Sequence, residues 1–403
     1  MELFWLEHKK LWRKKIVKIC VLLCFVYCVI FGSILSFQWF CFGSSDDYTS
    51  AFGNNFDGYT VIKDSQEYAL SFGGELTDET LQKIVSDYQQ MEADGMEEEL
   101  EKTDWQIVNS WLGTLYPELR DTSNYKTMIS YVDPDKLTGF YERRQQVLDE
   151  FLEVSGQVGA EKEFLHQIER KVEKPFRYEW VEGWSTLLGS MVADLGVVMA
   201  LFLGIVLSSL FAGEWHDNTS TLVLTTRNGW GKIALAKILT GLAFTVELFA
   251  LLAVSNVISQ LFFMGTAGWD MPIQNIKLIA VAPMNMLQAE IYEYAFVLLG
   301  AIGFAGIVMF ISAAVKNNVL TLLLSLTVVY GPMMIAEYLP YGMQKALDLI
   351  PLVGSSTDIF RTNTFRILGK LIWSPYLLIT IPVLIGILCM PFAIKSWSRR
   401  MKA

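Results

Sequence analysis

The chain has 403 residues, of which 52% are apolar and only 18% are charged, and its formal net charge is −10. Typical soluble domains are roughly 45–50% apolar, so this composition argues against an ordinary cytosolic enzyme. An aromatic content of 13% excludes a disordered or collagen-like chain. The acidic balance, without a large basic surface, argues against a nucleic-acid partner.

The charges separate the chain into two parts. Residues 42–184 carry 30 acidic and 13 basic side chains, a net of −17, whereas the rest of the chain has a net of +7. The acidic segment is therefore predicted to be a separate water-soluble domain, residues 41–184, long enough to bury a core of its own. The flanking segments are predicted to lie in a membrane.

Six apolar segments are long enough to cross about 30 Å of hydrocarbon as helices. The first precedes the acidic domain, and the other five lie within residues 185–403. The six predicted spans are residues 16–40, 185–211, 236–264, 294–315, 319–336 and 371–394. The chain is thus predicted to be an all-α polytopic protein of the cell membrane.

Basic residues in the short loops predict the orientation of these spans. They cluster before the first span, between the second and third, at Lys316 and after the last span. We therefore expect both termini in the cytoplasm and the acidic domain outside it. Four basic residues run against this rule: Lys345, Arg361, Arg366 and Lys370.

The segment before the first span, residues 1–15, mixes basic residues with Phe4, Trp5, Leu11 and Trp12. This mixture is typical of an interfacial helix that lies along the inner leaflet. The alternative is that its positive charge only sets the orientation of the first span. The 25-residue first span lacks a clear Ala-x-Ala-like cleavage site, so we expect it to remain as an anchor.

The acidic domain is predicted to be mostly helical. Thr77 can cap a helix with Asp78 and Glu79 in its first turn, and apolar residues then recur at helical spacing. Similar patterns follow in residues 105–115, 140–151 and 164–172. Four of the five cysteines lie in predicted spans, so no disulfide framework is expected in this domain. Trp180 and Trp184 are placed like interfacial anchors before the second span.

Catalytic motifs are missing from the sequence. There is no His-Glu-x-x-His or Gly-x-Ser-x-Gly, and the three histidines fall on opposite sides of the predicted membrane. The segment Gly229-Trp230-Gly231-Lys232 lacks the spacing of a phosphate-binding loop. We therefore expect no enzyme activity, no metal site and no cofactor bound by the chain itself.

The loop between the second and third spans is the most informative segment. Residues 211–232 run Phe-Ala-Gly-Glu-Trp-His-Asp-Asn-Thr-Ser-Thr-Leu-Val-Leu-Thr-Thr-Arg-Asn-Gly-Trp-Gly-Lys. This loop and the six-span layout resemble the permease subunits of ABC exporters of the six-helix type V architecture. Trp230 departs from the resemblance, because a basic residue commonly follows the turn glycine there.

The resemblance implies a transmembrane subunit of an ATP-driven exporter. ATP and Mg would be held by separate cytosolic ATP-binding subunits, and a second copy or a paralogue of the permease would complete the transporter. Residues 212–235 would then form a coupling loop, with its apolar run docked in a groove of the ATPase. The residues that would carry the coupling are Glu214, Asn218, Thr219, Leu222, Leu224, Thr226, Arg227 and Lys232.

Other interpretations remain open at this point. The loop could be an ordinary hairpin, and the chain could be a membrane-anchored receptor or sensor whose external domain binds a ligand. A secondary transporter is a third alternative, weakened by the absence of an evident internal repeat. For the exporter, the charge of the acidic domain would attract an amphipathic, cationic substrate such as an antimicrobial peptide, and the alternative is that this charge only keeps the domain soluble.

Two acidic residues lie deep in predicted spans. Asp194 and Glu247 fall at nearly matched depth in the second and third spans, and intramembrane carboxylates usually face a bundle interior or cavity. They are candidates for lining a transport path, and the alternative is a neutral carboxyl bonded to neighbouring polar groups. Glycines at 300, 303 and 306 predict close helix contact along the fourth span.

Overall fold

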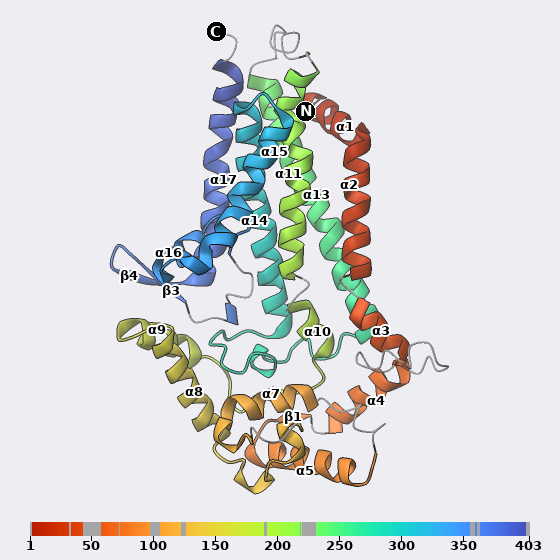
Figure 1. Cartoon of the computed structure of the whole chain (residues 1–403), viewed down its shortest axis with the longest axis vertical. Helices are drawn as coiled ribbons and strands as arrows, with labels where there is room; N and C mark the ends of the chain where they lie inside the picture. Colours follow the sequence, from red (N-terminus) through yellow and green to blue (C-terminus); the bar gives the residue numbers. More distant parts are fainter. Residues whose placement is uncertain are drawn as a thin grey trace.

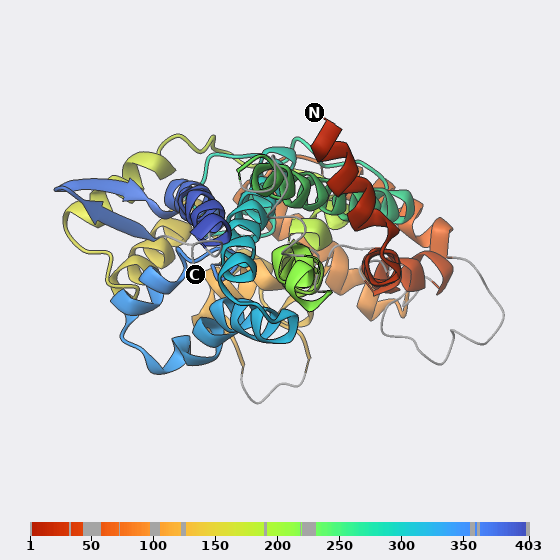
Figure 2. The ribbon, with the colours of Figure 1, turned by 90° about the horizontal axis from the view of Figure 1, so that it is seen from above.

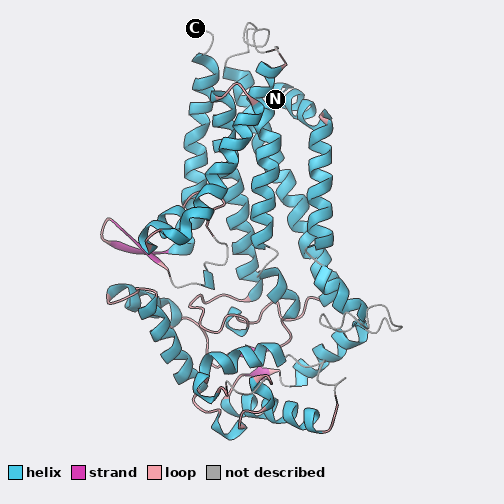
Figure 3. Cartoon of the chain, viewed as in Figure 1, coloured by secondary structure: helices cyan, strands magenta, loops and turns pink. Residues whose placement is uncertain are grey.

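The computed structural model describes residues 2–31, 34–42, 58–71, 73–96, 105–121, 126–188, 192–217, 219, 231–354, 359–360 and 363–399. It is mostly helical (Figure 3). A long helical bundle is joined at one end to a helical domain (Figure 1). We call this end of the bundle the domain end, and the opposite end, where the N-terminal helix α1 and the last turns of α17 lie, the terminal end.

Five helices of the described residues are long and apolar enough to cross a membrane. They pack together around one apolar core, and Figure 2 shows the bundle from above. Their presence is consistent with an all-α polytopic membrane protein, and they overlap five of the six predicted spans. These helices are α11 (Val192–His216), α13 (Gly231–Met264), α14 (Met286–Ala314), α15 (Asn318–Ile335) and α17 (Ser374–Arg399).

The first predicted span, residues 16–40, is not one continuous α-helix. It consists of α2 (Lys15–Val26), a π-helical turn η1 (Tyr27–Phe31) and α3 (Ile34–Phe42), and residues 32–33 lie outside the described residues. One face of α2 and η1, marked by the cysteines at 20, 24 and 28, is buried in the bundle core. These cysteines therefore pack against neighbouring helices, and six complete spans remain a prediction.

The helix α14 begins eight residues before the predicted fourth span. Asn285 caps it and forms a capping box with Gln288, which satisfies the first backbone N–H groups.

Further along, α14 lies against α17. A Cβ atom added to Gly303 would lie 2.3 Å from the Pro382 carbonyl oxygen, and one added to Gly306 would lie 2.4 Å from the Gly386 oxygen. The predicted glycine contact is thus confirmed, within a single chain.

The domain consists mainly of helices, as predicted. A two-stranded antiparallel sheet pairs β1 (Gly74–Glu75) with β2 (Arg177–Tyr178) and so brings the beginning and the end of its main body together. Thr77 caps α5 as expected, because its hydroxyl oxygen accepts a hydrogen bond from the Thr80 backbone N–H at 3.3 Å. The helices are α4 (Gly58–Ser71), α5 (Asp78–Ala93), α7 (Trp105–Leu115), α8 (Phe140–Val154) and α9 (Ala160–Glu169), with 3₁₀ turns η3 (Pro117–Leu119), η4 (Met128–Ser130) and η5 (Pro134–Lys136).

Arg144 of α8 fastens the domain to the loop between α13 and α14. Its buried guanidinium donates to the carbonyl oxygens of Leu278 at 2.7 Å and Ala280 at 3.1 Å, and to the Glu169 carboxylate at 2.6 Å. Lys174 also pairs with Glu169, at 2.7 Å. The domain therefore shares a packed interface with the bundle, beyond its covalent connections.

The two tryptophans before the second span are also part of this interface. Trp180 and Trp184 are buried, and their indole N–H groups donate to the carbonyl oxygens of Met264 and Thr266. The expectation that they anchor in the membrane interface is therefore wrong, because the end of α13 and the following loop cover them. The short helix α10 (Glu182–Thr186) contains Trp184 and packs against α13.

The segment between α15 and α17 contains further short elements. After η8 (Ala336–Tyr338) comes α16 (Tyr341–Leu347), and then a hairpin of β3 (Thr364–Ile367) and β4 (Lys370–Trp373). The sixth predicted span begins at residue 371, but the structure places residues 370–373 in this strand and starts α17 at Ser374. A further 3₁₀ turn, η7 (Ile273–Asn275), lies in the loop before α14.

Candidate functional site

The N-terminal helix α1 (Glu2–Arg13) packs against α13 at the terminal end of the bundle (Figure 1). Leu11 is buried in the bundle core, and the Trp12 ring meets Phe244 edge-on with the centroids 5.6 Å apart. Trp5 and Leu6 are exposed. The structure therefore forms a helix over Glu2–Arg13 with one face on α13, and its position along the inner leaflet stays a prediction.

A buried ion pair joins α11 and α13 beneath α1. The Lys237 ammonium lies 2.9 Å from Glu214 Oε1, and the two side chains are only 2% and 4% exposed. The helix α1 supplies one further partner to each ion: Glu7 lies 2.7 Å from Lys237, and Lys10 lies 2.6 Å from Glu214. Four alternating charges thus connect three helices, and we call Glu7, Lys10, Glu214 and Lys237 the charge network.

The pKa values of Lys10, in α1, and Lys14, in the turn after α1, are shifted in opposite directions by these surroundings. Burial alone would lower the pKa of Lys10, but the hydrogen bond and the negative charge of Glu214 outweigh it and raise that pKa. Burial lowers the pKa of Lys14, and the nearby Lys237 and Lys10 lower it further. Lys14 donates to the Ser209 hydroxyl at 3.0 Å. The network therefore holds Lys10 as a firmly charged group, while Lys14 experiences an excess of positive charge.

Glu214 also anchors the beginning of the predicted coupling loop. The Thr219 hydroxyl donates to the second carboxylate oxygen of Glu214, and the Thr219 backbone N–H donates to the Glu214 carbonyl oxygen at 3.0 Å. Because Lys237 lies on the first turns of α13, the charge network connects both ends of the loop. Two of the eight predicted coupling residues, Glu214 and Thr219, are brought together here.

The other predicted coupling residues are not part of this network. Lys232 is exposed on the first turn of α13. Five others lie outside the described residues, so their coupling role stays a prediction: Asn218, Leu222, Leu224, Thr226 and Arg227.

The structure places Glu247 against α1. Its carboxylate accepts a hydrogen bond from the Trp12 indole N–H at 3.0 Å and lies 3.2 Å from His8 Nε2, and its side chain is 45% exposed. The side chain of Asp194 lies outside the described residues. A path lined by both acids therefore stays a prediction, and the contacts of Glu247 with Trp12 and His8 favour a role in holding α1.

Sequence reasoning missed two kinds of charged residue. The pairing of Lys237 with Glu214 could have been suspected, because charged groups inside apolar helices normally pair with one another.

Glu290 and Glu293 of α14 were not singled out. Both are buried, and none of their carboxylate oxygens has a hydrogen-bond partner among the described residues, although the Tyr294 phenol approaches Glu290.

The charge network joins three helices through ion pairs. It contains no nucleophile paired with a base, and within the described residues no group of three or more His, Cys, Asp or Glu side chains could hold a metal ion. What it can do is keep α1, α11 and α13 in one arrangement. No protein-family model, curated protein or solved structure matches this chain.

Proposed function

We propose that the chain is the transmembrane subunit of an ATP-driven exporter that works with separately encoded cytosolic ATP-binding subunits. The sequence of the 212–235 loop motivates this proposal, and the charge network is the observation that carries it. The buried pair Lys237–Glu214 closes the base of the loop, and Glu7 and Lys10 tie this base to α1.

The network gives a physical route for coupling. Removing one partner of a buried ion pair typically costs about 3–5 kcal/mol, because the remaining charge is left buried and uncompensated. Moving α11 and α13 apart would leave both charges uncompensated in the same way, so the adjoining ends of these two helices resist separation. A partner that pushes on the loop would therefore displace both helices and α1 together. In this account the terminal end of the bundle faces the cytoplasm, and ATP and Mg are bound by the partner.

The domain would respond at the opposite end. Because Arg144 holds the loop that connects α13 and α14, a tilt of these helices would be passed to the domain. In the proposed orientation this domain is extracytoplasmic, and its net charge of −17 over residues 42–184 favours amphipathic, cationic substrates such as peptides. A second permease copy or a paralogue would complete the transporter.

The test is purification of the full chain, tagged and solubilised in mild detergent, from cells that express its neighbouring proteins at native levels. We expect a nucleotide-binding protein to copurify in stoichiometric amount and to hydrolyse ATP in the complex. A matched preparation of an unrelated polytopic protein controls for carry-over. A chain that purifies without any ATP-binding protein, in detergent and in lipid nanodiscs alike, would contradict the proposal.

A further inference from the structure

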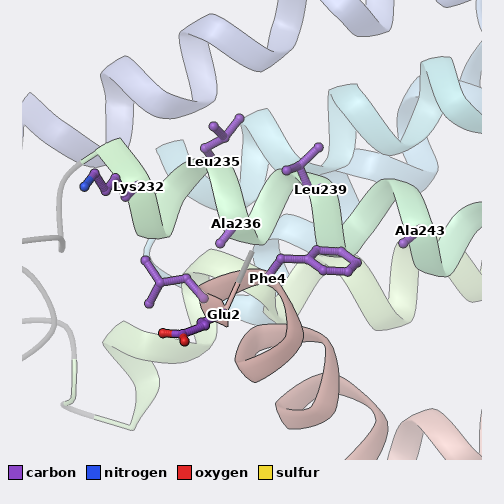
Figure 4. Close-up of a pocket in the computed structure, with 8 residues that line it drawn as sticks. Glu2, Phe4, Lys232, Leu235, Ala236, Leu239 and Ala243 are labelled. Atoms are coloured by element: carbon purple, nitrogen blue, oxygen red, sulfur yellow. The ribbon is translucent and has the colours of Figure 1, made fainter.

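A groove of about 790 Å³ lies between α1 and the first turns of α13. Its walls are mostly apolar and include Leu3 and Phe4 of α1 together with Leu235 and Leu239 of α13. Figure 4 shows the Phe4 side chain beside α13, between the two charged residues at one end and Ala243 at the other. This α1–α13 groove lies beside the charge network but shares no residue with it.

The groove runs along a membrane-spanning helix. Its α13 residues extend from Lys232 to Ala243, which corresponds to about 17 Å along the helix axis. Leu235 and Leu239 are 49% and 45% exposed, so the α13 wall opens sideways. In a membrane, such an opening faces hydrocarbon and not water, and the natural occupant is an acyl chain.

Two opposite charges lie at one end of this apolar groove. Lys232 of α13 and Glu2 of α1 both line it, and Figure 4 places them at the end away from Ala243. A lone lysine would favour any phosphate. The added carboxylate disfavours a headgroup with a net negative charge and favours one that carries a cation beside its phosphate.

We propose that the α1–α13 groove binds a phospholipid whose headgroup carries a primary ammonium, of the phosphatidylethanolamine type. Its phosphate pairs with Lys232, its ammonium donates to Glu2, and one acyl chain lies along Leu235 and Leu239 toward Ala243. A quaternary ammonium has no N–H to donate, so a choline headgroup would lack the charge-assisted hydrogen bond to Glu2. This inference needs no ATP-driven function and depends only on the membrane position of α13.

The experiment is native mass spectrometry of the full chain, purified and then exposed to equal amounts of phosphatidylethanolamine, phosphatidylcholine and phosphatidylglycerol with identical acyl chains. The expected wild-type result is retention of the ethanolamine lipid over each of the other two by about tenfold, the size of one charge-assisted hydrogen bond. Equal retention of all three, or preference for phosphatidylglycerol, would overturn the proposal.

Two variants locate the binding. Ala243→Trp fills the apolar end of the groove, and Ala250→Trp is its matched control, seven residues away on the same face of α13 but outside the groove. We expect loss of the retained lipid in the first variant only; equal retention in both would overturn the assignment. Glu2→Gln keeps the side-chain shape and should abolish the preference for ethanolamine over glycerol headgroups. An unchanged preference would show that Glu2 does not select the headgroup.

Discussion

Lys237 and Glu214 form an ion pair 2.9 Å long that is almost completely shielded from solvent, although 23 positions separate them in the chain. Each also has a second partner from α1, Glu7 or Lys10. The pair therefore fixes the two helices at the base of the proposed coupling loop and fixes α1 upon them.

The first prediction concerns this pair. Lys237→Met and Glu214→Gln should each lower the free energy of unfolding, toward the lower end of about 3–5 kcal/mol, because one partner from α1 remains. The double variant should lose clearly less than the sum of the single losses, with a coupling energy of at least about 0.5 kcal/mol. Thermal or denaturant unfolding in detergent measures this cycle. Strictly additive losses would show that the two charges do not support each other.

The second prediction concerns the contact between α14 and α17. Gly303→Ala would place a methyl group within 2.3 Å of the Pro382 carbonyl oxygen, so the helices must separate. We expect a loss of about 1–3 kcal/mol, as for other overpacked cores.

The control for this contact is Gly196→Ala in α11, where an added Cβ meets no atom of the described residues within 4 Å. That variant should be neutral or slightly stabilising, because alanine favours the helix by up to about 1 kcal/mol over glycine. Melting temperatures of both variants in the same detergent decide the matter. Equal tolerance of the two substitutions would contradict the close packing of α14 on α17.

The third prediction concerns acid stability of the domain. Burial alone would raise the pKa of Glu169, but its hydrogen bonds from Lys174 and Arg144 outweigh burial and lower that pKa below its ordinary value of 4.5. A lowered carboxyl pKa gives stability that is present above the unfolded value and is lost as pH falls through the folded value. We therefore expect the attachment of the domain to weaken below about pH 4.5.

Limited proteolysis of the full chain across a pH series measures this attachment, with an acid-active protease at low pH and a protease active at neutral pH for the rest of the series. Glu169→Gln should make the chain susceptible at neutral pH and remove much of its further loss at low pH. Glu163→Gln, which removes a more exposed carboxylate from the same helix, is the control. A variant at Glu169 that keeps the wild-type pH profile would contradict the role of the buried carboxylate.

The fourth prediction concerns the buried carboxyls of Glu290 and Glu293 in α14, which are paired with no cation among the described residues. An ionised carboxylate buried without partners is costly, so a neutral amide of the same shape should be tolerated at Glu290 and Glu293. We expect Glu290→Gln and Glu293→Gln to leave the melting temperature unchanged or to raise it. A marked fall in both would indicate that these carboxylates are ionised and bound to a positive group.

The apolar helices of the bundle could be predicted from the sequence because hydrocarbon demands long apolar runs. Their ends could not be predicted as well. The helix α14 starts eight residues before the predicted span because Asn285 caps it. Its first turns contain the buried acids Glu290 and Glu293, and a search for apolar runs leaves out a segment with such charged residues. The break in the first span was also missed, although Gly32 and Ser33 follow η1 directly in the sequence and Gly/Ser pairs are a known cause of helix interruption.

Tertiary contacts were the harder part of the prediction. Trp180 and Trp184 precede an apolar span, as interfacial tryptophans do, and only the fold shows that the end of α13 covers them. Glu214 was predicted for its place in the loop, yet its partners come from helices distant in sequence, at Lys10 and Lys237. Spacing along one helix cannot show such pairings.

The most direct test of the proposed coupling role is the amount of ATP-binding protein that copurifies with variants of the loop. The double variant Leu222→Asp with Leu224→Asp replaces the apolar run that the resemblance assigns to the ATPase groove. Its control is Leu368→Asp, a fully exposed leucine at the tip of the β3–β4 hairpin. We predict that the loop variant inserts into the membrane normally but loses the ATPase, whereas the hairpin variant keeps it. Undiminished copurification and transport with the loop variant would contradict the account.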